Sequence, residues 1–137
     1  MGLASGSSEI GVEQVDRSGR DNPGEWLFKW RIQNKTAEPM RCLSVRVPHE
    51  KFRSRERVFE PPLAVAVGAS VILDMAVFCD EPPETIVENA FLILHIDWRQ
   101  AHWRLFVRLE IRVGAQGAPD SVTESITIQR VGFSGLS

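Results

Sequence analysis

Hydrophobic and polar residues alternate most regularly over residues 91–113. In the second half of this stretch every other residue is apolar, and the set is Trp103, Leu105, Val107, Leu109, Ile111 and Val113. A period of two is typical of a β-strand with one face in the core and the other in solvent. An earlier run, 91–98, has the same period, and a short polar break at 99–101 separates the two. The stretch therefore predicts a β-hairpin with an apolar inner face.

Other parts of the chain carry the same signal. Residues 25–33 place four large apolar side chains on one face, namely Trp26, Phe28, Trp30 and Ile32. Burying such a face stabilises the fold by roughly 1.5–3 kcal/mol for each large side chain. Further runs of β-forming residues predict strands at 9–15, 40–47, 63–67, 71–79 and 121–130. Turn-forming residues separate the runs, and no segment has a helical period.

Strict alternation also predicts which side chains face the core in two of these strands. In 40–47 it turns Leu43, Val45 and Val47 inward, and Cys42, Ser44 and Arg46 outward. In 121–130 it groups Val122 with Ile126 and Ile128 on one face.

Seven or eight strands without crossover helices predict antiparallel pairing, because parallel strands need such crossovers. We expect an all-β, two-sheet antiparallel sandwich over residues 9–130. A small barrel is less suitable, since the two best strands each carry four large inward residues. A flexible N-terminal tail, 1–8, and an apolar, glycine-rich C-terminal segment, 131–137, would flank the domain.

Part of the chain resembles bacterial immunoglobulin-like domains. The similarity lies in the aromatic strand 25–33, the small polar turn 34–39, strand 40–47, and the run Pro-Leu-Ala-Val-Ala-Val-Gly-Ala-Ser-Val-Ile-Leu at 62–73. It implies an immunoglobulin-like sandwich. The chain lacks the Cys–Trp–Cys core of antibody domains. Since this fold hosts many functions, the resemblance transfers no functional residue.

Composition and charge argue against some classes of function. The net charge of the 137 residues is −2, which gives no general attraction to nucleic acid or an anionic membrane. No apolar run approaches the roughly 20 residues of a membrane-spanning helix, and the N-terminus lacks the features of a secretion signal. We therefore predict a cytoplasmic protein that binds neither nucleic acid nor membrane. In that setting Cys42 and Cys79 are expected to be free thiols, with a bridge between neighbouring strands as the alternative.

Residues 49–59 form a basic stretch that contains Lys51, Arg53, Arg55 and Arg57. Such a stretch can bind phosphate or an acidic partner. The simpler interpretation is a charged loop or edge strand that discourages aggregation. The low net charge, the two glutamates within the stretch and Glu60 directly after it favour the simpler interpretation.

The outer face of the predicted hairpin carries His95, Asp97 and His102. These three side chains are possible metal ligands or an acid–base pair, but only if the strand register brings them together. A polar face with cross-strand ion pairs, such as Asp97 with Arg104, is the simpler interpretation. Because no nucleophile–base pair is evident, we predict a protein that is not an enzyme and has no metal or cofactor.

The same face carries the apolar residues Phe91, Ile93 and Phe106. Exposed apolar area usually marks an interaction surface. The alternative is that the chain's own C-terminal segment, 121–137, covers them, and the sequence does not distinguish the two. Apolar residues of the C-terminus, Val131, Phe133 and Leu136, would contribute in either case.

These observations predict a non-catalytic protein–protein interaction module, a subunit or adaptor of a larger assembly. Its partner would be another protein or a second copy of this chain. The predicted contact residues are Phe91, Ile93, Arg104, Phe106, Arg108 and Phe133. The alternative is a sandwich that binds a carbohydrate or another small ligand. That function requires Trp98 and Trp103 to be exposed at the hairpin tip.

Overall fold

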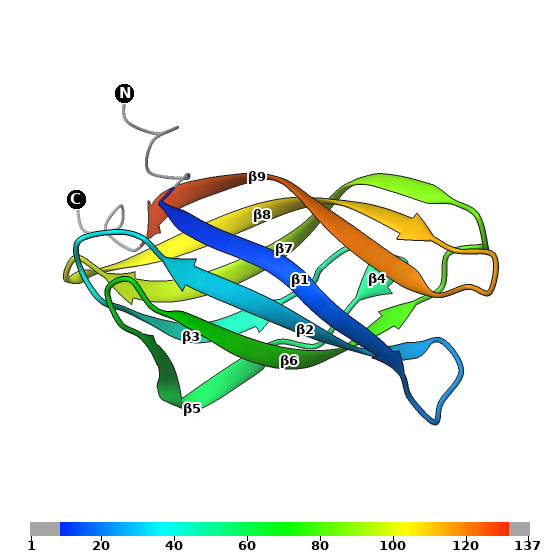
Figure 1. The fold of residues 1–137 in the computed structure, drawn as a ribbon, viewed down its shortest axis with the longest axis horizontal. Helices are drawn as coiled ribbons and strands as arrows, with labels where there is room; N and C mark the ends of the chain where they lie inside the picture. Colours follow the sequence, from blue (N-terminus) through cyan, green and yellow to red (C-terminus); the bar gives the residue numbers. More distant parts are fainter. Residues whose placement is uncertain (1–8, 132–137) are drawn as a thin grey trace.

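A computed structural model describes residues 9–131, which form nine strands and no helix (Figure 1). Their bounds are β1 Ile10–Gly19, β2 Glu25–Asn34, β3 Met40–Arg46, β4 Phe52–Arg53, β5 Arg57–Val65, β6 Ser70–Cys79, β7 Ile86–Trp98, β8 Ala101–Val113 and β9 Pro119–Val131. The sequence pattern predicts seven or eight strands. The additional one is β4, a two-residue strand inside the basic stretch. The predicted tail 1–8 and residues 132–137 lie outside the described residues, and Val131 is the last residue of β9.

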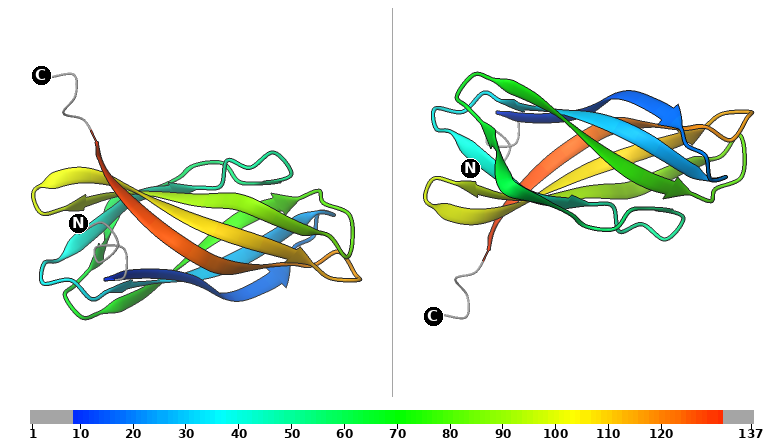
Figure 2. Two further views of the ribbon diagram at one scale, coloured as in Figure 1. Left: turned by 90° about the horizontal axis from the view of Figure 1, so that it is seen from above. Right: turned by 90° about the horizontal axis from the view of Figure 1, so that it is seen from below.

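The strands form two antiparallel sheets. One has the order β1-β2-β6-β4 and the other β5-β3-β7-β8-β9. The sheets pack face to face, and the edge strands β1 and β9 lie side by side (Figures 1 and 2). Side chains join these edges: the Thr123 hydroxyl donates to the Val12 carbonyl at 2.8 Å, and Arg17 and Asp120 form an ion pair at 2.9 Å. One side of the sandwich is therefore closed.

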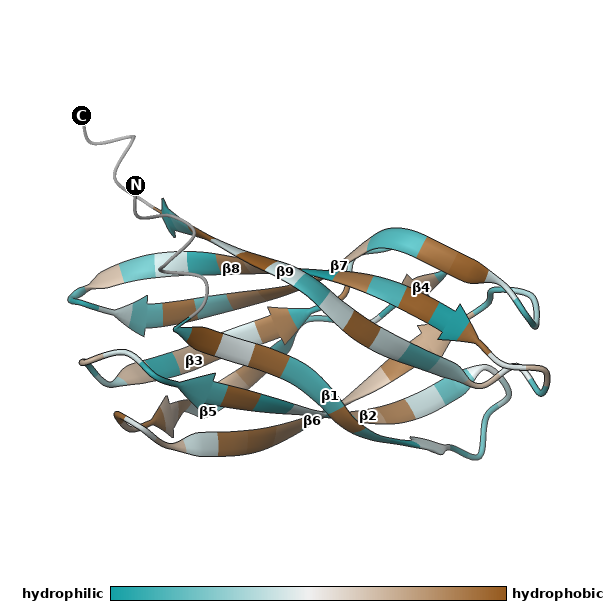
Figure 3. Ribbon diagram, turned by 45° about the horizontal axis from the view of Figure 1, so that its top comes forward, coloured by the Kyte–Doolittle hydropathy of each residue, from teal (hydrophilic) through white to brown (hydrophobic). Residues whose placement is uncertain are grey.

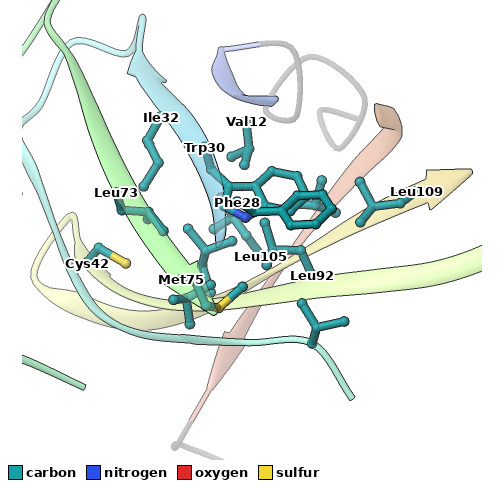
Figure 4. Close-up of a cluster of buried hydrophobic side chains, with 14 of the residues drawn as sticks. Val12, Phe28, Trp30, Ile32, Cys42, Leu73, Met75, Leu92, Leu105 and Leu109 are labelled. Atoms are coloured by element: carbon teal, nitrogen blue, oxygen red, sulfur yellow. The ribbon is translucent and has the colours of Figure 1, made fainter. Parts of the chain in front are cut away.

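The core lies between the sheets, as alternation predicted for β2. Phe28 and Trp30 are fully buried and stack with their ring centroids 5.6 Å apart. Phe52 of the short strand β4 meets Phe28 edge-on at 5.5 Å. Side chains from both sheets surround these rings (Figure 4).

The predicted hairpin is β7 and β8. Its register pairs Leu94 with Leu105 and Ile96 with Trp103 across the two strands. The inner side chains of β7 and β8 are buried apart from Trp103, which is half-buried. Alternating hydrophobic and hydrophilic bands follow the strands (Figure 3).

The alternation predicted for β3 is wrong in its first half. A bulge between Cys42 and Ser44 shifts the register, so that Cys42 is buried beside Leu73 (Figure 4). Leu43 is only half-buried, whereas Val45 faces the core as expected. The extra residue of a bulge reverses the alternation on one side of it. Cys42 and Cys79 are free thiols.

A second bulge corrects the prediction for β9. Arg108 of β8 pairs with Ser125, but the next residue, Leu109, pairs with Thr123. Glu124 is the extra residue. Val122 is therefore turned outward and is 44% exposed. Ile126 and Ile128 pack against the core, as predicted.

A buried polar network fixes the turn between β2 and β3. The Asn34 side-chain amide donates to the carbonyls of Glu38 and Val65 at 2.9 and 3.1 Å. Its carbonyl oxygen accepts from the backbone N–H and the hydroxyl of Thr36. The Trp98 indole N–H then donates to the Thr36 hydroxyl at 3.1 Å. The network ties this turn to the tip of the β7–β8 hairpin.

Within residues 9–131 the structure contains no helix that has the length and apolar character needed to cross a bilayer.

Candidate functional site

The outer face of the β7–β8 hairpin brings together five of the six predicted contact residues. The strand register places Ile93 opposite Phe106, Phe91 opposite Arg108, and His95 opposite Arg104. The sixth predicted residue, Phe133, lies outside the described part of the chain.

Three of these residues form an apolar group that we call the outer cluster: Phe91, Ile93 and Phe106. The rings of Phe91 and Phe106 meet edge-on with centroids 6.5 Å apart. Ile93 is 7% exposed, and both rings are half-buried. Because cross-strand neighbours on one face stand close together, the three side chains make one continuous apolar surface.

The structure rules out part of the cover that the sequence analysis considered. Residues 119–131 form β9, which pairs with β8 in the same sheet and does not lie over its face. The proposed cover by the C-terminal segment is therefore wrong for residues 121–131. Its remaining part, 132–137, lies outside the described residues.

Arginines border the outer cluster. The guanidinium of Arg104 lies 5.6 Å from the Phe106 ring centroid, and its buried Nε has no hydrogen-bond partner within residues 9–131. Arg46 of β3 stands opposite Ile93. Arg108 forms an ion pair with Glu124 at 3.5 Å. The cluster is thus apolar at its centre and cationic at its margin.

His95 shares this environment. Burial lowers the pKa of His95 below its ordinary value. The Glu56 carboxylate opposes this shift, whereas the charges of Arg104 and Arg46 add to it. The imidazole therefore favours its neutral form on this face.

The predicted constellation of His95, Asp97 and His102 does not assemble. Asp97 contacts His102 and forms an ion pair with Arg41 at 3.6 Å, while His95 faces Arg104. The face does carry cross-strand ion pairs, but the pair expected between Asp97 and Arg104 is wrong. Among the described residues no group of three His, Cys, Asp or Glu side chains is placed to hold a metal ion.

A hollow of about 740 Å³ lies at the hairpin tip, beside Arg41, Asp97, Trp98 and His102. Trp98 is only 5% exposed, and Arg99 lies over its ring at 4.1 Å. Trp103 is half-buried and donates its indole N–H to the Trp98 carbonyl at 2.8 Å. The small-ligand alternative requires both tryptophans to be exposed at the hairpin tip. This requirement is not met.

A second hollow, of about 700 Å³, lies between residues 53–57 and the strand β6. The sequence analysis identified the basic residues of this wall but not the strand that they face. Arg53 lies over the Phe78 ring at 4.5 Å, and Arg57 pairs with Asp74. Local composition gives no signal for this juxtaposition, because it depends on how the two sheets are connected.

No protein-family model matches this chain, and a search of curated proteins finds no sequence match.

Proposed function

We propose that this chain is a non-catalytic protein–protein interaction module that binds its partner through the outer cluster. One observation carries the proposal. Phe91, Ile93 and Phe106 form a continuous apolar group on the outer face of a sheet, and β9 extends that sheet instead of lying over this face. Contiguous apolar area of this kind on a polar surface is typical of an interaction site.

The chemistry of the margin supports a protein partner. Aromatic side chains and arginine are enriched at the centres of protein interfaces. Arg104 and Arg46 have no ion-pair partner within the described part of the chain. We therefore infer that the partner presents apolar side chains bordered by carboxylates. It is another protein or a second copy of this chain.

The strand order supports an immunoglobulin-like arrangement of the sandwich. In that fold the second strand pairs with the fifth, and the third pairs with the sixth. Here β2 pairs with β6, and β3 pairs with β7, with the short β4 beside β6.

The test compares affinity capture from native lysate by three forms of the full chain: wild type, Phe106→Asp and Ile72→Asp. Ile72 lies on the outer face of the other sheet and is 50% exposed, so it is a matched control. We expect wild type and Ile72→Asp to capture the same partner and Phe106→Asp to lose it. Circular dichroism confirms that each variant is folded. Capture that survives Phe106→Asp but not Ile72→Asp would move the contact to the other sheet.

A further inference from the structure

One edge of the four-stranded sheet is almost unpaired. β6 pairs with β2 along its length, but β4 pairs with it only at Phe78 and Cys79. The next strand in the chain, β5, belongs to the other sheet. The edge of β6 from residue 70 to residue 77 therefore has no strand partner within the described residues.

The hydrogen bonds that flank the β2–β6 ladder fix the direction of its backbone groups. The Cys79 N–H donates to the Gly24 carbonyl at 2.8 Å, and the Asn34 N–H donates to the Ala69 carbonyl at 2.9 Å. Because residues of an antiparallel strand alternate in the side to which they bond, odd-numbered residues of β6 bond to β2. The N–H and C=O groups of Ala76 consequently point to the open edge.

The open edge faces the hollow beside residues 53–57. Met75, Ala76 and Val77 line one wall of this hollow, and Arg55 lies in the opposite wall. Met75 and Val77 are buried, so the wall formed by β6 has apolar side chains next to free backbone groups. A peptide that adds to a sheet edge as an extended strand needs both features: free backbone groups for its hydrogen bonds and an apolar surface for its side chains.

The charge of the hollow that remains unneutralised is positive. Arg55 has no hydrogen bond or ion pair within residues 9–131. Two carboxylates also line the hollow: Glu25 forms an ion pair with Arg20 at 3.6 Å, and Glu56, which accepts from the neutral Ser44 hydroxyl, offsets only one of the two remaining cations, Arg53 and Arg55. Arg57 already donates to the backbone carbonyl of Asp74, which occupies that position of the edge. The free positions are thus the backbone of Ala76 and the guanidinium of Arg55.

We propose that the edge of β6 at Ala76 accepts an extended peptide strand from another protein. The strand bonds to the N–H and C=O of Ala76. Its apolar side chains alternate with polar ones, so that they pack beside Met75 and Val77, and one carboxylate pairs with Arg55. This surface lies on the other sheet from the outer cluster, and it stands or fails independently of the function proposed above.

The test uses a phage-displayed library of random short peptides as the probe and the intact full chain as the target. Selected peptides are synthesised, and their affinity is measured by fluorescence anisotropy. We expect them to alternate apolar residues with Asp or Glu. Ala76→Pro should weaken binding by about tenfold or more, because the peptide carbonyl loses its donor. Ala76→Ser keeps the N–H and should bind as wild type does.

Proline is suited to this position because the N–H that it removes is not part of the ladder with β2. Circular dichroism checks that Ala76→Pro is folded. Arg55→Glu is the second variant, and its effect should shrink as salt is added. Selected peptides that bind both variants as well as wild type would overturn the proposal, and so would a library that yields no binder. A dimer in sedimentation that Ala76→Pro dissociates would also overturn it, by making the occupant a second copy of this chain.

Discussion

Trp30 lies at the centre of the core, fully buried and stacked on Phe28. We expect Trp30→Ala to lower the free energy of unfolding by about 3–5 kcal/mol, the range for removing a large buried aromatic side chain. Chemical denaturation measures the loss. Lys29→Ala, on the opposite face of β2, is the control. A change below about 1 kcal/mol for Trp30→Ala, the size of a surface effect, would contradict the inward register of β2.

Asn34 is a buried polar residue whose side-chain amide nitrogen and oxygen both form hydrogen bonds. Replacing it by alanine leaves the Thr36 N–H and the carbonyls of Glu38 and Val65 without their partner. Each unsatisfied buried group costs roughly 1–3 kcal/mol, so Asn34→Ala should destabilise the protein by at least that amount. The neighbouring exposed Lys35, changed to alanine, provides the comparison in thermal and chemical denaturation. Equal stability of the two variants would mean that the network does not hold the turn.

His95 gives the stability a pH dependence. The pKa of His95 is lowered in the folded protein, chiefly by burial, from its ordinary value of 6.5. The unfolded chain therefore binds the proton more readily. Stability contributed by neutral His95 is complete above pH 6.5 and is lost as the pH falls towards the lower, folded value. His95→Gln should flatten the dependence of the unfolding free energy on pH in this window. Parallel curves for variant and wild type would exclude His95 as the cause.

At the scale of the residue, the sequence predicted the core of the long strands well. A strand that faces both a core and solvent must alternate, and the side chains of β2 and β8 follow that period. Partners across strands were less predictable. Asp97 pairs with His102 and Arg41 rather than Arg104, because the pairing depends on a register that no single strand specifies.

At the scale of the element, bulges separate the sequence pattern from the structure. Cys42 and Val122 are both on the side opposite to the one predicted, and each lies near a register shift. A bulge adds one residue to one strand without any change in composition. Strict alternation therefore cannot detect it. The turns that separate the strands were visible in the sequence, whereas the two-residue β4 was not, and β5 runs through Pro61 and Pro62 instead of beginning after them.

The bulge in β3 makes a prediction about Cys42. Burial raises the pKa of the Cys42 thiol to about 12, although a backbone hydrogen bond at Ser44 acts in the opposite direction. Since the thiolate is the reactive form, Cys42 should resist alkylation in the native protein and react once the protein is unfolded. Mass spectrometry of the Cys79→Ser variant follows this thiol alone. Rapid labelling of the native protein would mean that Cys42 faces outward, and it would contradict the bulge in β3.

At the scale of the whole molecule, the two sides of the sandwich differ. β1 and β9 close one side with hydrogen bonds and the ion pair of Arg17 with Asp120. On the other side β6 has an open edge beside a hollow. The sequence predicted two antiparallel sheets but not their order. The open edge follows from that order, so no local pattern indicated it.

The outer cluster was predictable from the sequence, because apolar residues at the solvent-facing positions of an alternating strand break the pattern. The position of β9 beside this face, and not over it, was not predictable, since it depends on the strand order. The proposed interaction surface belongs to this scale, because it combines both strands of the hairpin with Arg46 of β3.

A partner that binds the outer cluster must lie against Phe106. The most direct measurement is photo-crosslinking in living cells, with a benzophenone amino acid at position 106 in one form of the full chain and at position 72 in another. We predict that position 106 gives one discrete crosslinked product, to another protein or to a second copy, and that position 72 does not give that product. The same products from both positions, or none from position 106, would contradict it.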